Sequence, residues 1–287
     1  MEKYGLVLEG GGVRGAYTAG ALAWLNDQGI VFDYSAGISS GAVYLACYEL
    51  ANKESARNMA LYYATDKENV GIRAFLREGH YVAYEYLIND YLIKKEHLDV
   101  EKLRDQKVNM EIGLYDLEKG ETVWFGSEYL ENKLRLLRAA CALPIASAPV
   151  EFHGKLYLDG GVTKMIPIER SIEQGCTKHL VITTKPADFV RKPGSPAVKI
   201  MMRMFYHDYP KLREDYNVRH LNYYKQMDLI EKLIQEGNAI MVRPTKTVNV
   251  SRYKGDSKDL AELYDLGYQD MEDRKEEIFR FMGKDND

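Results

Sequence analysis

The sequence predicts an α/β fold with a mostly parallel central sheet. Short apolar runs typical of buried strands alternate along the 287 residues with longer stretches of helical spacing. Two glycine-containing turns, at 10–15 and 37–41, each follow a strand-like run and precede a helix-like one. Because open α/β sheets bind ligands at the carboxyl ends of their strands, we expect the functional residues at these turns. The length fits a single domain over 1–287.

The expected elements follow from apolar spacing and from turn residues. The N-terminal half is predicted to hold strands at 4–8 and about 32–38, with helices at 42–51, 54–65, 72–76 and 84–92. Strand-like runs at 108–115 and 121–125, joined by a short turn that contains Gly120, predict an antiparallel hairpin. A helix over about 129–141 precedes a strand at 155–158. Pro167 then opens a helix that stops at Gly175, before a β-branched strand at 178–184.

The turn Gly37-Ile38-Ser39-Ser40-Gly41 is the first candidate for chemistry. A glycine two residues either side of a serine lets the backbone fold sharply enough to hold one hydroxyl at a strained, exposed apex. The helix that follows aims its N-terminal amides at whatever the hydroxyl attacks. Ser39 is therefore predicted to be the nucleophile of an acyl-transfer enzyme, and the alternative is a plain glycine-rich turn.

The loop Gly10-Gly11-Gly12-Val13-Arg14-Gly15 is the second candidate. Consecutive glycines let backbone N–H groups converge on one point, as an oxyanion hole requires. Gly10, Gly12 and Gly15 also fit a dinucleotide fingerprint, which keeps a nucleotide-binding oxidoreductase as an alternative. That fingerprint needs an acid at the end of the next strand. Asp33 stands at its beginning instead.

The turn Asp159-Gly160-Gly161 follows a strand-like run and is the third candidate. A serine hydroxyl reacts only when a base takes its proton, and a carboxylate at a strand end could approach Ser39 for that purpose. Burial or hydrogen bonding would have to tune the pKa of such an aspartate. The alternative is a structural D-G-G turn.

Together these motifs resemble the patatin-like phospholipase family. The glycine loop, the Gly37–Gly41 elbow, the segment Ala139-Ala140-Cys141-Ala142-Leu143-Pro144 and the Asp159 turn occur in the order found in that family, over residues 4–184. The stretches 240–244 and 263–268 are similar to the tail of bacterial members. The resemblance implies a three-layer α/β/α sandwich.

The resemblance also implies a serine–aspartate dyad, with Ser39 as nucleophile and Asp159 as base. The amides of Gly10, Gly11, Gly12, Val13, Arg14 and Gly15 would form the oxyanion hole, with Arg14 helping to hold it. The family hydrolyses acyl esters of lipids through an acyl-enzyme, so we expect a lipid ester substrate, no metal and no other cofactor. A catalytically inactive lipid-binding protein on the same fold is a further alternative.

A histidine base is the alternative to the dyad. In α/β-hydrolases a histidine follows the acid along the chain, and three histidines follow Asp159. His179 opens a predicted strand, whereas His207 and His220 lie in a basic, tyrosine-rich stretch. Structural or solvated roles are the expectation for all three.

Composition and charge exclude several classes. A net charge of −4 argues against general nucleic-acid binding. We expect no secretory signal, and no apolar run in the sequence is long enough to cross a bilayer. Cys47, Cys141 and Cys176 are widely spaced in apolar settings, which indicates buried free thiols and a cytoplasmic location.

Two C-terminal segments stand apart. Residues 190–225 hold eight Lys or Arg against three acids, along with methionines and aromatic residues. We expect 190–235 to form a helical flap or cap that contacts an anionic membrane or micelle surface, and the alternative is a packed helix pair with a solvated basic face. Residues 256–287 carry a helical apolar stripe and are expected to dock on the domain as a helical extension, frayed from Lys284.

Overall fold

The fold is built around one mixed β-sheet, and the structure, a computed structural model, describes residues 2–105, 107–131 and 133–284. Within these residues the sheet has eight strands in the order β5-β6-β3-β2-β1-β7-β8, with β4 paired to β3 off this path. The strands are β1 (Tyr4–Leu8), β2 (Tyr34–Gly37), β3 (Met110–Asp116), β4 (Glu121–Gly126), β5 (Val150–Phe152), β6 (Lys155–Asp159), β7 (Lys178–Ile182) and β8 (Ala239–Val242). The pairs β1–β2, β1–β7, β2–β3 and β7–β8 are parallel, which confirms the predicted α/β class.

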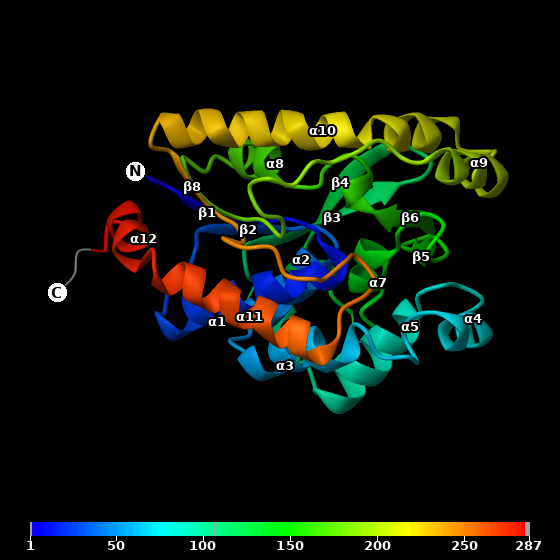
Figure 1. Ribbon diagram of the computed structural model, residues 1–287, viewed down its shortest axis with the longest axis horizontal. Coiled ribbons are helices and arrows are strands. Elements are labelled where there is room, and N and C mark those ends of the chain that lie inside the picture. The colour runs from blue at the N-terminus through cyan, green and yellow to red at the C-terminus, as the bar shows by residue number, and fades with distance from the viewer. Residues whose placement is uncertain (1, 106, 132, 285–287) are drawn as a thin grey trace.

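Helices cover both faces of this sheet, so the molecule has three layers (Figure 1). The α-helices are α1 (Ala16–Asp27), α2 (Ser40–Glu49), α3 (Lys53–Asn58), α4 (Ile72–Glu78), α5 (Tyr84–Tyr86), α6 (Val100–Asp105), α7 (Arg135–Cys141), α8 (Ile168–Glu173), α9 (Pro196–Phe205), α10 (Pro210–Gln235), α11 (Ser257–Glu272) and α12 (Lys275–Phe281). Short 3-10 turns are η1 (Gly12–Gly15), η4 (Ser127–Tyr129) and η5 (Gly160–Val162), and π-helical segments are η2 (Met59–Tyr63) and η3 (Leu87–Lys95). In Figure 1, α8 and α10 lie above the sheet, and α1, α3 and α11 lie below it.

The side chains of strand β1 explain why helices cover both faces of the sheet. Successive side chains of a strand point to opposite faces, and all of those from Leu6 to Leu8 are buried. Leu6 and Leu8 belong to the large core with α1, α2 and α11, whereas Val7 packs with residues of α8 and α10 such as Ile168 and Ile230. A strand that is apolar on both sides is typical of a parallel sheet between two helical layers.

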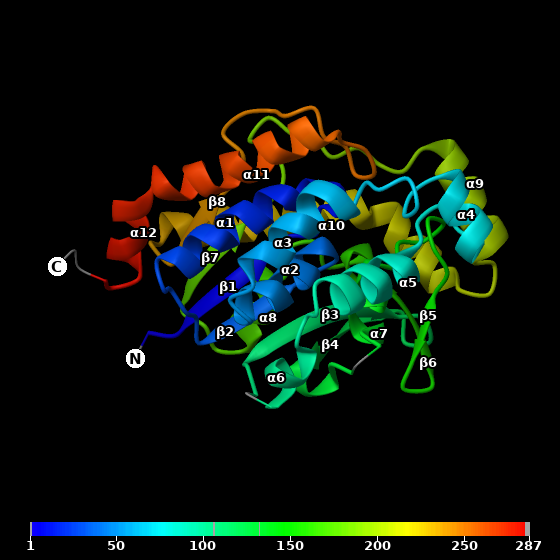
Figure 2. The same ribbon diagram turned by 90° about the horizontal axis from the view of Figure 1, so that it is seen from below.

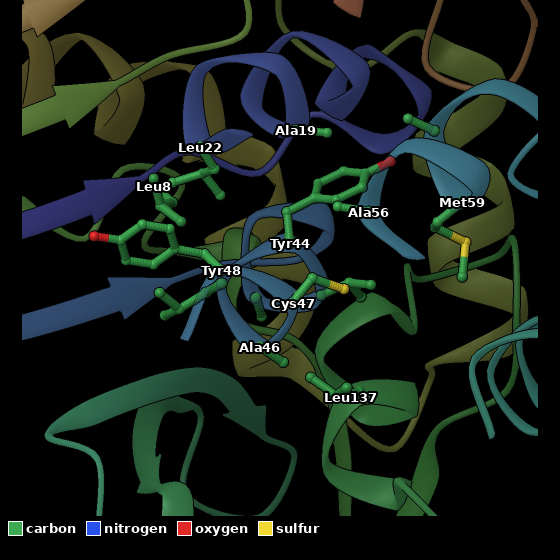
Figure 3. Packing of buried hydrophobic residues seen from close by; sticks show 14 of the residues in the cluster. Leu8, Ala19, Leu22, Tyr44, Ala46, Cys47, Tyr48, Ala56, Met59 and Leu137 are labelled. Atoms are coloured by element: carbon green, nitrogen blue, oxygen red, sulfur yellow. The ribbon is translucent and has the colours of Figure 1, made fainter. Parts of the chain in front are cut away.

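The large core centres on α2, which follows the predicted serine turn. Figure 3 shows Tyr44, Cys47 and Tyr48 of α2 among side chains from β1, α1 and α7, including Leu8 and Leu137. This helix is buried on nearly every side, so its first turn is held rigidly against the sheet.

Helix α11 docks on α1 through two glycines. A Cβ atom on Gly20 would lie 1.9 Å from the carbonyl oxygen of Tyr264, and one on Gly267 would lie 2.1 Å from that of Tyr17. The two backbones therefore approach too closely for any side chain at these positions. Through this contact α11 becomes part of the layer below the sheet (Figure 2). Of the residues expected to fray, Lys284 onward, 285–287 lie outside the described residues, and Lys284 itself donates its backbone N–H to the carbonyl oxygen of Phe279.

Several expectations at the level of elements need correction. The helix predicted over 129–141 begins only at Arg135, because Tyr129 ends a 3-10 turn and Leu134 has a positive φ of 46°. The helices predicted over 54–65 and 84–92 each pass into a π-helical segment. The predicted hairpin is present as β3 and β4, and the three cysteines are buried free thiols, as expected. None of the described helices is long and apolar enough to cross a membrane.

Candidate active site

Ser39 lies at a strained turn between β2 and α2. Its backbone has φ 55° and ψ −129°, outside the regions that residues with a side chain normally occupy. Such a conformation costs on the order of 1–3 kcal/mol and persists where the surroundings enforce it. The flanking glycines leave room for the turn, since a Cβ on Gly37 or Gly41 would lie 2.8–2.9 Å from other backbone atoms. The predicted strand, sharp turn and helix are therefore all present.

Asp159 and Ser39 line one pocket because two strands meet end to end on one edge of β3. Strand β4 occupies the other edge of β3 from Glu111 to Asp116. Strand β2 runs parallel to β3 and ends with Gly37 opposite Ile112, while β6 runs antiparallel and ends with Asp159 opposite Leu114. The carboxyl ends of β2 and β6 thus point at each other from positions only two residues apart on β3, about 7 Å along the strand.

Gly113 makes this meeting sterically feasible. It lies between the two partner positions, and a Cβ there would be 2.4 Å from the Cδ1 atom of Ile38. A Cβ on Gly160 would likewise lie 2.5 Å from the carbonyl oxygen of Gly113. The serine turn and the aspartate turn both pack against the bare backbone of β3 at this glycine.

The carboxylate of Asp159 is buried, and only one of its two oxygens accepts a hydrogen bond among the described residues. Its Oδ1 atom accepts a hydrogen bond of 2.7 Å from the Gly161 N–H, whereas Oδ2 has no hydrogen-bond partner among the described residues. Burial raises the pKa of Asp159, and the nearby Arg219, the Ser39 hydroxyl and the Gly161 N–H each oppose that rise. Ser39 and Asp159 line the same pocket, but among the described residues no hydrogen bond joins the two side chains. Such contacts often tighten only when substrate binds.

The glycine loop wraps around the serine turn. A Cβ on Gly10 would lie 2.8 Å from the Cβ of Ser39, so the loop backbone touches the serine directly. Three of its amides already donate within the protein: those of Gly10, Gly11 and Val13, to Met165 O, Ser40 Oγ and Arg252 O respectively. Arg14 donates from Nε to the carbonyl oxygen of Val250 and so anchors the loop, while Gly15 ends η1. Among the described residues the N–H of Gly12 has no acceptor.

Two pockets of opposite character meet at Ser39. The first is mainly apolar, with walls that include Val43, Met59, Val82, Leu87 and Ile88. The second holds Asp159 together with five cationic side chains, namely Arg14, Lys185, Arg191, Arg219 and Arg252. Ser39, Gly12 and Arg252 line both pockets. An ester bond held at Ser39 could therefore place an apolar chain on one side and a polar group on the other.

Apart from Arg14, which was predicted at the oxyanion hole, the cations of the polar pocket were not predicted as site residues. Arg191 and Arg219 were counted in the basic stretch 190–225, but only as part of a flap surface. Lys185 follows β7 and forms a buried ion pair with Glu9, which follows β1. A sequence signal did exist for this pair, because each residue stands just beyond the carboxyl end of a predicted parallel strand.

The three candidate histidines stay outside both pockets. His179 is buried on β7, where its Nδ1 atom lies 2.9 Å from the Ser171 hydroxyl, and burial lowers its pKa to about 4. His207 is exposed beside Asp208. His220 lies on α10 and does not contribute to either pocket wall as described.

Asp33 does not lie where a dinucleotide-binding site would need an acid. Asp33 accepts a hydrogen bond from the Tyr4 N–H at the start of β1, so it stands at the opposite end of the sheet from Gly12. The described residues also contain no group of three or more His, Cys, Asp or Glu side chains arranged to hold a metal ion.

The fold and the site define a class: an α/β protein with a strained serine at the carboxyl edge of its sheet. The sequence matches the profile of the patatin-like phospholipases over residues 6–172, and the chain belongs to that family. Residues 209–283 match a second profile, a domain of unknown function numbered 6363.

Two individual proteins show how far the likeness extends. The uncharacterized protein YjjU of Escherichia coli K12 is 27% identical over 202 residues, which cover 66% of this chain and 54% of that protein. The chain therefore spans about half the length of this curated relative. The crystal structure of VipD from Legionella pneumophila superposes with a TM-score of 0.51 at 13% identity, over 95% of this chain and 66% of that one. At that identity the match supports the fold alone.

Proposed function

We propose that this protein hydrolyses lipid esters with Ser39 as the nucleophile and Asp159 as its base. The observation that carries the proposal is the end-to-end meeting of β2 and β6 on β3, which brings the two side chains to one pocket. A carboxyl whose pKa burial raises is a stronger base once ionised than an ordinary aspartate.

In the proposed reaction, Ser39 Oγ attacks the ester carbonyl carbon and its proton passes to Asp159. The carbonyl oxygen takes up the negative charge and accepts a hydrogen bond from the Gly12 N–H, the loop amide without an acceptor in the described structure. The carbon–oxygen bond to the alcohol then breaks, and the alcohol leaves with the proton from Asp159. Water attacks the acyl-enzyme by the same route, which releases the fatty acid and returns the proton to Ser39.

The apolar pocket supplies the binding site for the acyl chain. Its walls are nearly free of charged groups, so it suits a hydrocarbon chain and not a head group. Val70 and Val82 pair across an isolated β-bridge on its wall, and α4 projects from the chain between them.

We also propose that α4 and α9 contact the lipid surface. Both carry exposed large apolar side chains, which are Ile72, Phe75 and Leu76 on α4 and Ile200, Met204 and Phe205 on α9. Both helices lie at the same end of the molecule in Figures 1 and 2. Exposed apolar side chains beside basic ones are typical of a surface that binds the membrane interface.

This proposal makes the flap shorter than the predicted segment 190–235. Helix α10 buries Tyr223, Met227 and Ile230 against the sheet, so it is a layer of the fold and the surface flap covers about 190–209. Residues 1–287 are then one domain, with the helices after 256 docked on α1. The buried free thiols support a reducing compartment, and hence a cytoplasmic location.

Turnover of a lipid ester tests the proposed function. Wild type should hydrolyse a long-chain monoacylglycerol, Ser39→Ala should lose that activity to background, and the exposed Ser257→Ala should retain it. Vesicle binding by wild type without turnover would favour the inactive lipid-binding alternative. Thermal stabilisation by NAD without turnover would favour the oxidoreductase.

A further inference from the structure

Gln226 on α10 holds a distant loop segment through hydrogen bonds to its backbone. The side chain is buried, with only 2% of its surface exposed. Its Oε1 atom accepts from the N–H groups of Met165 and Ile166, and its Nε2 atom donates to the carbonyl oxygen of Thr163, each at 3.1 Å. Residues 163–166 form an irregular segment between η5 and α8. One side-chain amide therefore supplies the hydrogen bonds that a neighbouring strand would otherwise provide.

The segment needs these partners because it is buried. Met165 is 1% exposed and Ile166 is fully buried, and both belong to the core that α10 forms with the sheet. Buried backbone groups without partners are strongly unfavourable, since water cannot replace the lost hydrogen bonds. Loss of the Gln226 amide would leave two N–H groups and one carbonyl oxygen to find new partners, so the segment would have to move.

This segment connects the aspartate turn to the glycine loop. At its start, the Lys164 N–H donates to the carbonyl oxygen of Gly160 at 3.0 Å. One residue later, the carbonyl oxygen of Met165 accepts from the Gly10 N–H at 3.1 Å. Gly10 in turn lies against Ser39, since a Cβ atom on this glycine would be 2.8 Å from the serine Cβ. A shift of the segment would therefore displace the glycine loop beside the proposed nucleophile.

The other end of the glycine loop is also held by the C-terminal part of the chain. The Val13 N–H donates to the carbonyl oxygen of Arg252 at 3.0 Å, and Arg14 Nε donates to that of Val250 at 3.1 Å. Val250 is itself buried in the large core. Both acceptors, like Gln226, lie in the region that matches a domain of unknown function, beyond the end of the patatin-like profile.

We propose that Gln226 is a positioning residue for the oxyanion hole, and that the C-terminal region 209–283 keeps the glycine loop in its catalytic position. The inference rests on the proposed function, because it takes the Gly12 N–H as the oxyanion donor. Gln226 lines neither pocket as described, so it acts through Met165 and not on the reacting atoms. Position is decisive for such a donor, since a displacement of about 1 Å can reduce the rate about 10²-fold.

The test replaces the amide and follows two inhibitors together with turnover of p-nitrophenyl butyrate, a soluble ester. An alkyl trifluoromethyl ketone bonds to Ser39 Oγ at its carbonyl carbon while the serine proton passes to Asp159, and the resulting oxygen anion needs the oxyanion hole. The matching trifluoromethyl alcohol binds without that bond. Gln226→Leu should lower kcat and the affinity for the ketone about 10²-fold each, with little change in KM or in affinity for the alcohol.

Two further variants complete the comparison. Gln226→Glu keeps an acceptor for both N–H groups but loses the amide donor, so it should lose about tenfold in kcat. Ile230→Val is the control for destabilisation, because Ile230 is buried one turn further along α10 and forms no side-chain hydrogen bond. It should keep the wild-type kcat. Thermal unfolding shows whether each variant is folded at the assay temperature, and Gln226→Glu carries the comparison if Gln226→Leu is not.

The outcomes separate the positioning role from the function on which it rests. A wild-type kcat in the folded Gln226 variants overturns the role. A rise in KM alone, or equal weakening of the ketone and the alcohol, also overturns it, because the side chain would then only shape the pocket. An equal loss of kcat in Ile230→Val assigns the effect to general destabilisation instead. The proposed function fails on a different result, namely no turnover of p-nitrophenyl butyrate or of a long-chain monoacylglycerol by wild type.

Discussion

Two opposing influences act on the pKa of Asp159. Burial raises it, and Arg219 is the strongest of the groups that lower it. Arg219 also donates to the carbonyl oxygen of Gly161, so it holds the turn on which the carboxylate lies. We therefore regard Arg219 as a positioning residue for the proposed base.

Replacement of Arg219 should change the pH profile of the reaction. A base acts only when it is ionised, so kcat/KM should fall as the pH drops through the pKa of Asp159. Arg219→Gln removes the main influence that lowers this pKa, so the acidic limb of the profile should move to higher pH. The readout is kcat/KM for a neutral soluble ester from pH 4 to 9, with Arg280→Gln as the control. An unshifted limb would contradict the assigned role of Arg219.

Gly12 should tolerate no side chain. It has φ +61°, and a Cβ there would lie 2.5 Å from the carbonyl oxygen of Arg252. Gly12→Ala should displace the loop amide from the developing oxyanion and lower kcat by about 10²–10³. Gly29 has nearly the same φ, +59°, with nothing within 4 Å of the added atom, so Gly29→Ala is the matched control and should keep full activity. Comparable activity of the two variants would exclude Gly12 from the oxyanion hole.

At the scale of the elements, the sequence predicted where strands end better than it predicted which strands pair. Ser39 and Asp159 could be picked out because glycines mark each turn locally. Their meeting depends on β6 entering antiparallel beside β3, and the sequence did not indicate that pairing because strand order is set by tertiary contacts. Gly113, in the middle of a predicted strand, was the local sign of a close backbone approach. The three-residue β5 and the short β8 were too brief to be predicted as strands.

Helix α4 should contribute to membrane binding. Phe75 is exposed on it, and burial of such a side chain in a lipid interface contributes about 1.5–3 kcal/mol. Phe75→Ser should therefore weaken sedimentation with phosphatidylglycerol-containing vesicles about tenfold or more, without loss of turnover on a soluble ester. Val31→Ser is the control, because the Val31 side chain is also exposed but lies in the connection between α1 and β2. Unchanged vesicle binding by Phe75→Ser would remove α4 from the proposed surface.

The contact between α1 and α11 should be sensitive to a single methyl group. Gly267→Ala would force the two helix backbones apart, and overpacking of this kind costs about 1–3 kcal/mol. The midpoint of thermal unfolding should fall by several degrees. Asp265→Ala, on the exposed side of the same helix, should leave the midpoint unchanged or raise it. A Gly267→Ala variant as stable as wild type would show that the helices can separate freely.

Across the whole molecule, the candidate catalytic residues and most of the cations beside them come from different parts of the chain. The predicted nucleophile, base and glycine loop lie within 6–172, where short motifs carry strong local signals. Lys185, Arg191, Arg219 and Arg252 lie beyond, on separate loops and a helix that only the folded chain brings together. Sequence reasoning therefore identified the candidate chemistry but assigned Arg191 and Arg219 to a surface, because charged stretches are usually solvated, and did not single out Lys185 or Arg252.

Covalent labelling by a fluorophosphonate measures most directly whether Asp159 activates Ser39. Peptide mapping should place a single adduct on Ser39 in wild type, with no adduct in Ser39→Ala. Asp159→Asn should slow labelling by about 10²–10⁴, the usual contribution of a positioned base, while the exposed Asp265→Asn should label at the wild-type rate. An adduct on another residue, or labelling of Asp159→Asn as fast as wild type, would contradict the account.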